Sequence, residues 1–162
     1  MARTGNSKPI TPDQRVRDLR KELRTLERDA PGPQRAAQLA AFTRAAHLER
    51  QLNMAMHTAA LCLAEDPAAP ALLLAAYDPD DVDGEERLAA LSDLHDLARY
   101  LERDDLTAVA DQRLQETAEA WVLAGTEGER RYRLRTVQSL ATDAITDTIR
   151  DRLDRERFGL GG

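Results

Sequence analysis

The sequence predicts an all-α fold, an elongated helical bundle of five to six helices around one long central helix. Three observations support this prediction. Residues 34–65 contain neither Gly nor Pro and are rich in residues of high helix propensity. All eight glycines and seven prolines of the 162-residue chain fall at expected helix boundaries or in the tails. No segment of useful length alternates apolar and polar residues with the period of two that a strand requires.

The central helix is predicted to run from Pro33 to Asp66. Apolar residues recur in it at steps of three and four, which places them on one side of a helix. The members of this stripe are Ala41, Ala45, Leu48, Leu52, Ala55, Ala59 and Cys62. At 1.5 Å per residue such a helix is roughly 50 Å long, and we expect it to need packing partners along its whole length.

A shorter helix is predicted before the central one. Thr11, Pro12 and Gln14 form a start signal, with a capping box and a proline at the first helical position. Heptad-like spacing then follows at Val16, Leu19, Leu23, Leu26 and Ala30. The Pro-Gly-Pro sequence at 31–33 ends this helix, so we expect the first and central helices to be antiparallel neighbours.

Four further helical segments are predicted after the central helix. They are a short apolar helix at 71–77, helices at 85–102 and 104–124, and one last helix at 126–157 that begins with a Thr126/Glu129 capping box. The expected organisation is a flexible tail at 1–10, a single helical domain at 11–158 and a flexible end at 159–162. No internal repeat of fixed period is evident.

The amino-acid composition limits which cellular compartments and which kinds of binding partner we expect for this protein. The formal net charge is −6, which argues mildly against attraction of the whole chain to nucleic acid or anionic membrane. The N-terminus has no apolar signal core, and no apolar run approaches the eighteen residues of a membrane span. We therefore expect a cytoplasmic protein with no membrane partner. Cys62 is the only cysteine, which excludes an intrachain disulfide and is expected to be a buried core residue.

The sequence contains no recognisable catalytic motif. A nucleophile elbow, a phosphate-binding glycine loop, an H-E-x-x-H motif and paired C-x-x-C motifs are all missing. His47 and His57 would lie about 80° apart around a helix and 15 Å apart along it, so one metal ion could not bind both without a third element. We expect a protein that is not an enzyme, with no catalytic residue, metal ligand or cofactor.

A predicted acidic loop leaves cation binding open as an alternative to a purely structural role. Its carboxylates belong to Asp78, Asp80, Asp81, Asp83, Glu85 and Glu86. Oxygen ligands of this kind suit calcium or magnesium, but their register does not fit an EF-hand. We favour a solvated loop in which Asp83 caps the next helix, and cation binding remains the alternative.

The first function hypothesis is a protein–protein interaction or assembly protein that self-associates, with a homodimer as the expected state. A self-association seam is predicted at Val16, Leu19, Leu23, Leu26, Leu48 and Leu52. The same spacing is also compatible with packing of the first helix inside the chain. The mismatch in length between the first and central helices favours a second copy or another protein as partner.

The second hypothesis is binding of nucleic acid or an acidic partner through the last helix. Its candidate contacts are Arg130, Arg131, Arg133 and Arg135, with Tyr132 as a stacking ring. The alternative interpretation is a solvent-exposed helix face without a binding role, on which the arginines form ion pairs at i and i+4, namely Glu127–Arg131, Glu129–Arg133 and Asp151–Arg155. A ligand- or metal-dependent enzyme with a pocket between helices ranks third.

Overall fold

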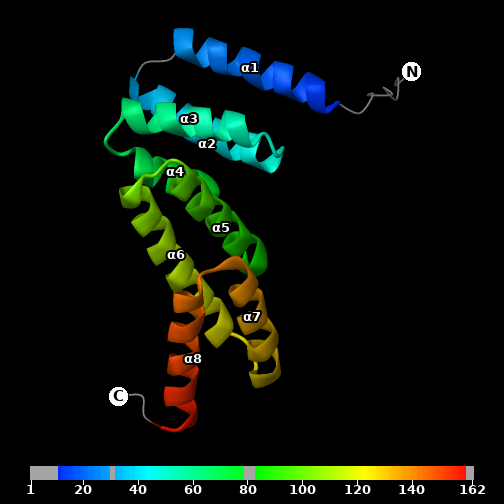
Figure 1. Ribbon diagram of the computed structural model, residues 1–162, viewed down its shortest axis with the longest axis vertical. Helices are drawn as coiled ribbons and strands as arrows, with labels where there is room; N and C mark the ends of the chain where they lie inside the picture. Colours follow the sequence, from blue (N-terminus) through cyan, green and yellow to red (C-terminus); the bar gives the residue numbers. More distant parts are fainter. Residues whose placement is uncertain (1–10, 30–31, 79–82, 160–162) are drawn as a thin grey trace, which may run out of the picture. The chain divides into compact units, whose positions relative to one another are not determined.

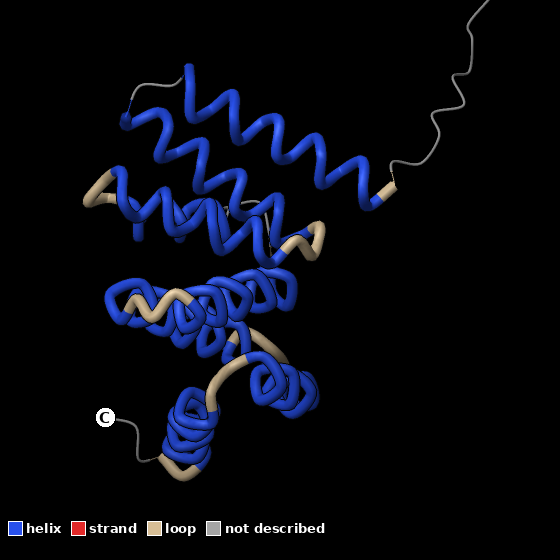
Figure 2. Tube along the Cα trace, turned by 45° about the horizontal axis from the view of Figure 1, so that its top comes forward, coloured by secondary structure: helices blue, strands red, loops and turns tan. Residues whose placement is uncertain are grey.

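The computed structural model describes residues 11–29, 32–78 and 83–159 and is helical almost throughout (Figures 1 and 2). The side chains of 12, 13, 15, 16, 27 and 29 are not described. No strand occurs in these residues, which confirms the all-α class. The described helices are α1 Pro12–Asp29, α2 Gly32–Leu48, α3 Leu52–Glu65, α4 Ala69–Tyr77, α5 Gly84–Tyr100, α6 Asp104–Leu123, α7 Glu127–Leu140 and α8 Asp143–Arg157. The tail predicted at 1–10 lies outside the described residues, as do 160–162 of the predicted C-terminal end.

The chain divides into two compact units. Unit 1 extends to Asp66 and contains α1, α2 and α3, and unit 2 begins at Pro67 and contains α4 to α8. The predicted long central helix is wrong, because α2 ends at Leu48 and α3 starts at Leu52. The two helices form an antiparallel hairpin within unit 1 (Figure 2).

The turn of this hairpin is a Schellman motif without glycine. Arg50 has a φ of 58°, in the left-handed region. The backbone N–H of Arg50 donates to the carbonyl of His47 at 3.0 Å, and that of Gln51 donates to the carbonyl of Ala46 at 2.8 Å. These two bonds satisfy carbonyls that the end of α2 leaves free. Reversal of the chain therefore needs only residues 49–51.

The buried faces of the two helices explain why the chain must turn. Ala46 is the last buried residue of α2 and Ala55 the first of α3, nine residues later. On one continuous helix, nine residues correspond to about 180° of rotation, so the two buried faces would point in opposite directions. A hairpin turns them toward each other. Leu48 and Leu52, which the sequence places inside the stripe, lie at the turn with 64% and 51% of their surface exposed.

The interior of the α2–α3 hairpin is built from small side chains and satisfied polar groups. The buried hydroxyls of Thr43 and Thr58 lie 2.9 Å apart, so one donates to the other, and the hydroxyl that accepts donates its own proton to a backbone carbonyl of its helix, that of Leu39 or of Met54. The Cys62 thiol donates to the carbonyl of Ala36 at 3.2 Å. Because these bonds satisfy the buried side chains of Thr43, Thr58 and Cys62, the close approach of the two helices costs little in desolvation of these groups.

α1 packs on α2 through part of the predicted seam. Leu19 is fully buried and Leu23 is 6% exposed, so both side chains are used inside unit 1. α1 runs antiparallel to α2, as the Pro-Gly-Pro signal predicts (Figure 2). The side chain of Val16 is one of those that the structure does not describe.

The predicted last helix is also divided in two. Ala141 is extended, and Thr142 is the N-cap of α8, where its hydroxyl accepts from the backbone N–H of Ile145 at 3.4 Å. The predicted capping box at the start of α7 is confirmed, since the Thr126 N–H donates to Glu129 at 2.8 Å and Glu129 N–H to the Thr126 hydroxyl at 3.4 Å. A capping threonine thus starts both helices.

The core of unit 2 gathers residues from four helices, with α4 lying against α5 and α6. Its buried members are Leu88, Leu91, Leu114, Ala118, Val122, Val137, Ile145 and Ile149. Trp121 packs at the edge, over the start of α5. A Cβ on Gly84 would lie 2.8 Å from the Trp121 indole nitrogen, so this close approach requires glycine.

The hairpins α2–α3 and α5–α6 are built alike. α2 and α5 each have 17 residues and begin with Gly, and 52 residues separate the left-handed Arg50 from the left-handed Glu102. The same offset relates the buried residues Ala36, Leu39 and Ala46 to Leu88, Leu91 and Ala98. Few of the paired residues are identical, so the likeness is in burial pattern and turn geometry, which a search for sequence periods does not detect.

We predict that Arg50→Gly stabilises the protein by about 1 kcal/mol, because glycine adopts the left-handed conformation without a Cβ clash. Urea unfolding followed by circular dichroism would measure the change. Ala60→Gly is the matched control, since Ala60 is exposed inside α3 and its replacement costs about 1 kcal/mol of helix propensity. A lower stability for Arg50→Gly would contradict the assigned turn.

Candidate functional site

A groove lies between α1 and α2 on the surface of unit 1. Its lining comes from one side of each helix, namely Asp18, Lys21, Glu22, Thr25 and Leu26 of α1 and Gln38, Ala41, Phe42 and Ala45 of α2. The groove has a volume of about 720 Å³. Its floor is apolar and its α1 wall carries both signs of charge, which is the chemistry of a surface for another helix.

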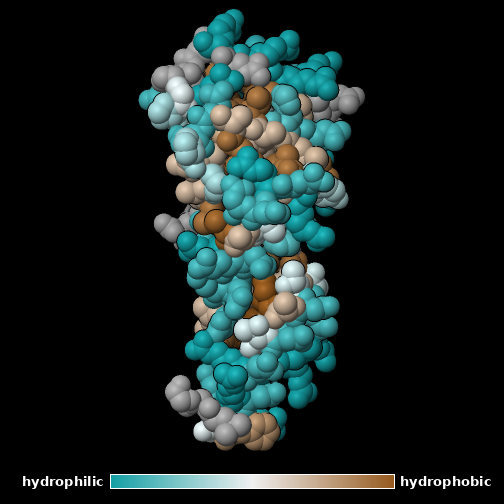
Figure 3. Space-filling view, turned by 60° about the vertical axis from the view of Figure 1, so that its left-hand side comes forward, coloured by the Kyte–Doolittle hydropathy of each residue, from teal (hydrophilic) through white to brown (hydrophobic). Residues whose placement is uncertain are grey.

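The outward face of α2 continues this groove. We define that face as Gln34, Ala37, Gln38, Ala41, Ala45 and Leu48, which lie within about 100° of one another around the helix. All are exposed except Ala45, which is half-buried, and none is charged. In a chain with 32% charged residues, an uncharged exposed helix face is unusual. Elsewhere on the molecule too, apolar side chains reach the surface between hydrophilic ones, as the face drawn in Figure 3 shows.

The five seam residues whose side chains the structure describes do not form one surface. Leu19 and Leu23 are buried between α1 and the hairpin, whereas Leu26 is half-buried and lines the groove. Leu48 and Leu52 are exposed at the α2–α3 turn. Sequence spacing identified apolar residues correctly but could not say which of them pack inside unit 1.

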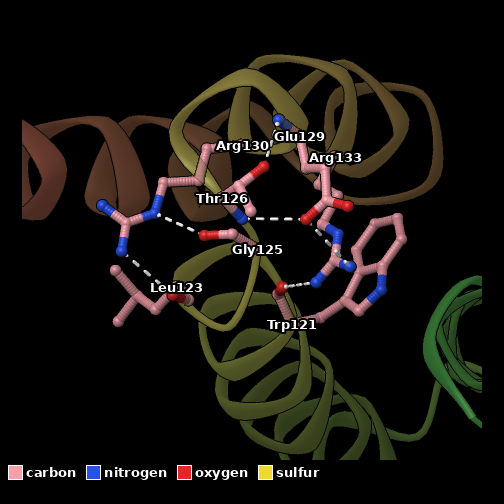
Figure 4. A network of polar contacts seen from close by, with 7 residues as sticks. All are labelled: Trp121, Leu123, Gly125, Thr126, Glu129, Arg130 and Arg133. Carbon is pink, nitrogen blue, oxygen red and sulfur yellow. Dashed lines mark hydrogen bonds and ion pairs between the residues drawn. The ribbon is translucent and has the colours of Figure 1, made fainter.

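Two of the four predicted arginine contacts, Arg130 and Arg133, bond from α7 to the end of α6 (Figure 4). Arg130 donates to the carbonyls of Gly125 at 3.1 Å and Leu123 at 3.0 Å. Arg133 donates to the carbonyl of Trp121 at 2.6 Å and lies 5.2 Å from the centre of its ring. These guanidinium groups satisfy carbonyls at the C-terminal end of α6, where positive charge also suits the helix dipole.

The other two arginines point to solvent. Arg131 and Arg135 are exposed on α7, and Tyr132 beside them is 59% exposed. No ion pair involves Arg131 or Arg135 within the described part of the chain, so the predicted Glu127–Arg131 pair is not formed there. The predicted Glu129–Arg133 pair is confirmed at 3.8 Å.

The acidic loop is described only at its two ends, since Asp80 and Asp81 lie outside the described residues. Asp78 has a side chain only 5% exposed and forms ion pairs with Arg87 and, at 3.8 Å, with Arg113. Asp83 occupies the N-cap position of α5 but makes no side-chain capping bond. Asp78 is therefore committed to arginines, and its carboxylate is not free for a cation.

Other chemically active side chains are separate from one another. In the ranges 11–29, 32–78 and 83–159, no three His, Cys, Asp or Glu residues are grouped so that they could hold a metal ion. Burial, with Asp66 nearby, raises the pKa of the Cys62 thiol to about 11, which disfavours the reactive thiolate. Sequence reasoning missed His95, which is buried with its Nε2 3.8 Å from an oxygen of Asp111 across the α5–α6 hairpin.

Comparisons with known proteins add no functional information. Neither a protein-family model, nor a curated protein, nor a solved structure matches this chain. None of the described helices combines the length and the apolar character needed to cross a membrane. The functional argument therefore depends on the surfaces of the two units.

We predict that Arg133→Ala destabilises the protein by about 1–3 kcal/mol, because it removes a charged donor from a carbonyl and the contact with Trp121. Arg131→Ala is the control on the same helix and is expected to change stability by less than about 0.5 kcal/mol. Thermal unfolding of both variants would measure the difference. Equal effects of the two substitutions would contradict the capping role of Arg133.

Proposed function

We propose that this protein is a non-enzymatic interaction and assembly protein that self-associates through α1 and α2. The observation that supports the proposal is the apolar α1–α2 groove together with the uncharged outward face of α2. An exposed helix face without charged side chains is typical of a surface that packs against another helix. α2 buries its inner face against α3 and α1, and its outward face is left for a partner.

The lining of the groove favours a helix over a small molecule as occupant. Small-molecule sites place several polar groups around one enclosed position. Here most polar side chains follow α1, from Asp18 to Thr25, with Gln38 on α2, and the floor consists of Leu26, Ala41, Phe42 and Ala45. An amphipathic helix lying along the floor would bury the apolar side chains and leave its polar side against α1.

A second copy of the chain is the occupant that we favour. A helix lying on this floor must present an uncharged face, because charges there would lose their water without gaining a partner. The outward face of α2 meets that requirement over four turns. Self-association would thus cover the groove and the face of both copies at once.

We predict that the protein is a dimer and that Ala41→Glu converts it to a monomer, because two carboxylates would be buried in the interface. Molar mass from light scattering on a sizing column would measure this. Ala108→Glu on α6 is the control, since Ala108 is exposed and outside the groove, and it should remain dimeric. A monomeric wild-type protein, or a dimer that persists in Ala41→Glu, would overturn the proposal.

A second candidate function is binding of nucleic acid through α7. The exposed group Arg131, Tyr132 and Arg135 favours it, because two guanidinium groups and a ring that a base could stack on occupy nearby positions of α7. The charge of the surrounding sequence opposes it, since residues 67–162 contain 12 arginines and 21 acidic residues. This candidate therefore ranks below self-association.

If α7 binds nucleic acid, Arg131→Ala with Arg135→Ala should weaken binding of single-stranded DNA at least tenfold and reduce its salt dependence. Fluorescence anisotropy with a labelled oligonucleotide would measure both. Arg150→Ala, an exposed arginine on α8, serves as the control. Absence of binding by the wild-type protein would exclude this function.

A further inference from the structure

We propose that His95 and Asp111 form a proton-operated clamp across the α5–α6 hairpin, which closes when His95 is protonated and opens when it is neutral. The proposal concerns unit 2 and is independent of self-association through α1 and α2. Three features support it: the burial of the two facing groups, the acceptors around the imidazole, and the corresponding position in the α2–α3 hairpin.

His95 and Asp111 face each other across the hairpin. The His95 side chain is 11% exposed, and its Nε2 lies 3.8 Å from Oδ1 of Asp111. This oxygen is buried and has no hydrogen-bond partner among the residues that the structure describes. Because N–H···O bonds span about 2.7–3.2 Å, the two groups are close but not bonded. A buried acceptor without a donor costs free energy, and an N–H at Nε2 is placed to satisfy it.

The second ring nitrogen of His95 also faces a carboxylate. Nδ1 lies 4.0 Å from Oδ1 of Asp96, whose side chain is 61% exposed. A neutral imidazole carries one N–H, so it matches at most one of the two oxygens and turns a lone pair toward the other. An imidazolium carries an N–H on both nitrogens and matches both. The two carboxylates therefore fit the charged ring and offset the cost of burying its charge.

One positive charge on α5 opposes protonation of His95. Arg99 is the only charged residue at three or four positions from it along the helix. Arg99 is exposed, so solvent and salt screen its repulsion of the imidazolium. On α6, the residues three and four positions from Asp111 are uncharged. Asp111 is thus the charge that α6 presents to the ring.

Charged groups of the other helices packed against α5 in unit 2 lie toward its start. Tyr77 is the only titratable residue of α4, and Asp78, directly after it, pairs with Arg87. Arg87 is eight residues from the imidazole, or about 12 Å along α5. On α7, the Tyr132 hydroxyl lies 3.5 Å from Glu85, at the first turn of α5.

The α2–α3 hairpin shows what this position holds when it does not titrate. The offset of 52 residues relates His95 to Thr43 and Asp111 to Ala59. The hydroxyl of Thr43 lies 2.9 Å from that of Thr58, so the buried polar group in this hairpin is satisfied. Threonine does not change charge with pH, whereas histidine does so between about pH 5 and 8. Only the α5–α6 hairpin therefore carries a contact at this level that responds to acid.

Closure of the clamp adds one proton from solvent to the imidazole and breaks no covalent bond. At low pH, Nε2–H donates a charge-assisted hydrogen bond to Oδ1 of Asp111, which joins α5 to α6. At high pH, the proton returns to solvent and the carboxylate oxygen again lacks its donor. The strength of the contact between the two helices thus follows the pH.

A double-mutant cycle at two pH values tests the clamp. His95→Thr and Asp111→Ala copy the residues that the α2–α3 hairpin carries at these positions, so both replacements suit the fold. The coupling between the two sites should favour the folded state at least about tenfold more at about pH 5 than at about pH 8. Urea unfolding of the wild-type protein, both single variants and the double variant, followed by circular dichroism, would measure this coupling.

Asp96→Ala is the matched control for the cycle. Its carboxylate is mostly in solvent, so its coupling to His95 should differ by less than about threefold between the two pH values. Coupling between His95 and Asp111 that is equal at both pH values would overturn the clamp. A pH-dependent coupling that belongs to Asp96 rather than to Asp111 would also overturn it, because no contact between α5 and α6 would then be involved.

Nuclear magnetic resonance of the unmodified protein provides a test that does not depend on how the variants fold. The Nε2–H proton of His95 should exchange slowly with water at about pH 5, because it is buried and bonded to a carboxylate, and its signal should disappear at about pH 8. His47 and His57, on α2 and α3, are the internal controls. A signal of equal strength at both pH values, or none at about pH 5, would contradict the proposal.

Discussion

The structure of unit 1 depends on a half-turn difference in phase between the apolar faces of α2 and α3. Nine residues from Ala46 to Ala55 rotate a helix by about 180°, so no straight helix can bury both faces against one partner. The chain reverses at Arg50, so that the buried faces of α2 and α3 pack against each other. The same reversal exposes Leu48 and Leu52 and leaves the uncharged side of α2 facing outward, which is why this helix becomes the candidate interface.

Sequence reasoning recovered the features that local signals determine and missed those that depend on packing. The all-helical class, the start of α1 at Pro12 and the Thr126/Glu129 capping box follow from propensity and capping chemistry alone. The break at Arg50 contains no glycine or proline. If residues 33–66 are drawn as one helix, Ala and Leu occupy nearly every side of it, so the sequence does not reveal that the buried face changes sides between α2 and α3. Thr142 followed by Asp143 is a usable N-cap signal, but threonines also occur inside helices, as Thr136 does in α7.

The candidate sites show the same limit. Periodicity marked the leucines of α1, but only the position of α1 on the hairpin separates buried Leu19 from Leu26 in the groove. The roles of Arg130 and Arg133 depend on where α6 ends, because their acceptors lie at Leu123 and Trp121. A cluster of arginines in a sequence therefore does not by itself predict an exposed positive surface. Some of the guanidinium groups can fold back and donate hydrogen bonds to the nearest unsatisfied carbonyls.

The setting of Trp121 has an optical consequence. It is the only tryptophan in the chain, and it lies within unit 2 between the start of α5 and the guanidinium of Arg133. Its emission consequently follows the integrity of unit 2 alone, whereas circular dichroism records the helices of both units. Comparing the two signals therefore shows whether the two units unfold together or separately in the unmodified protein, without cutting the chain between Asp66 and Pro67.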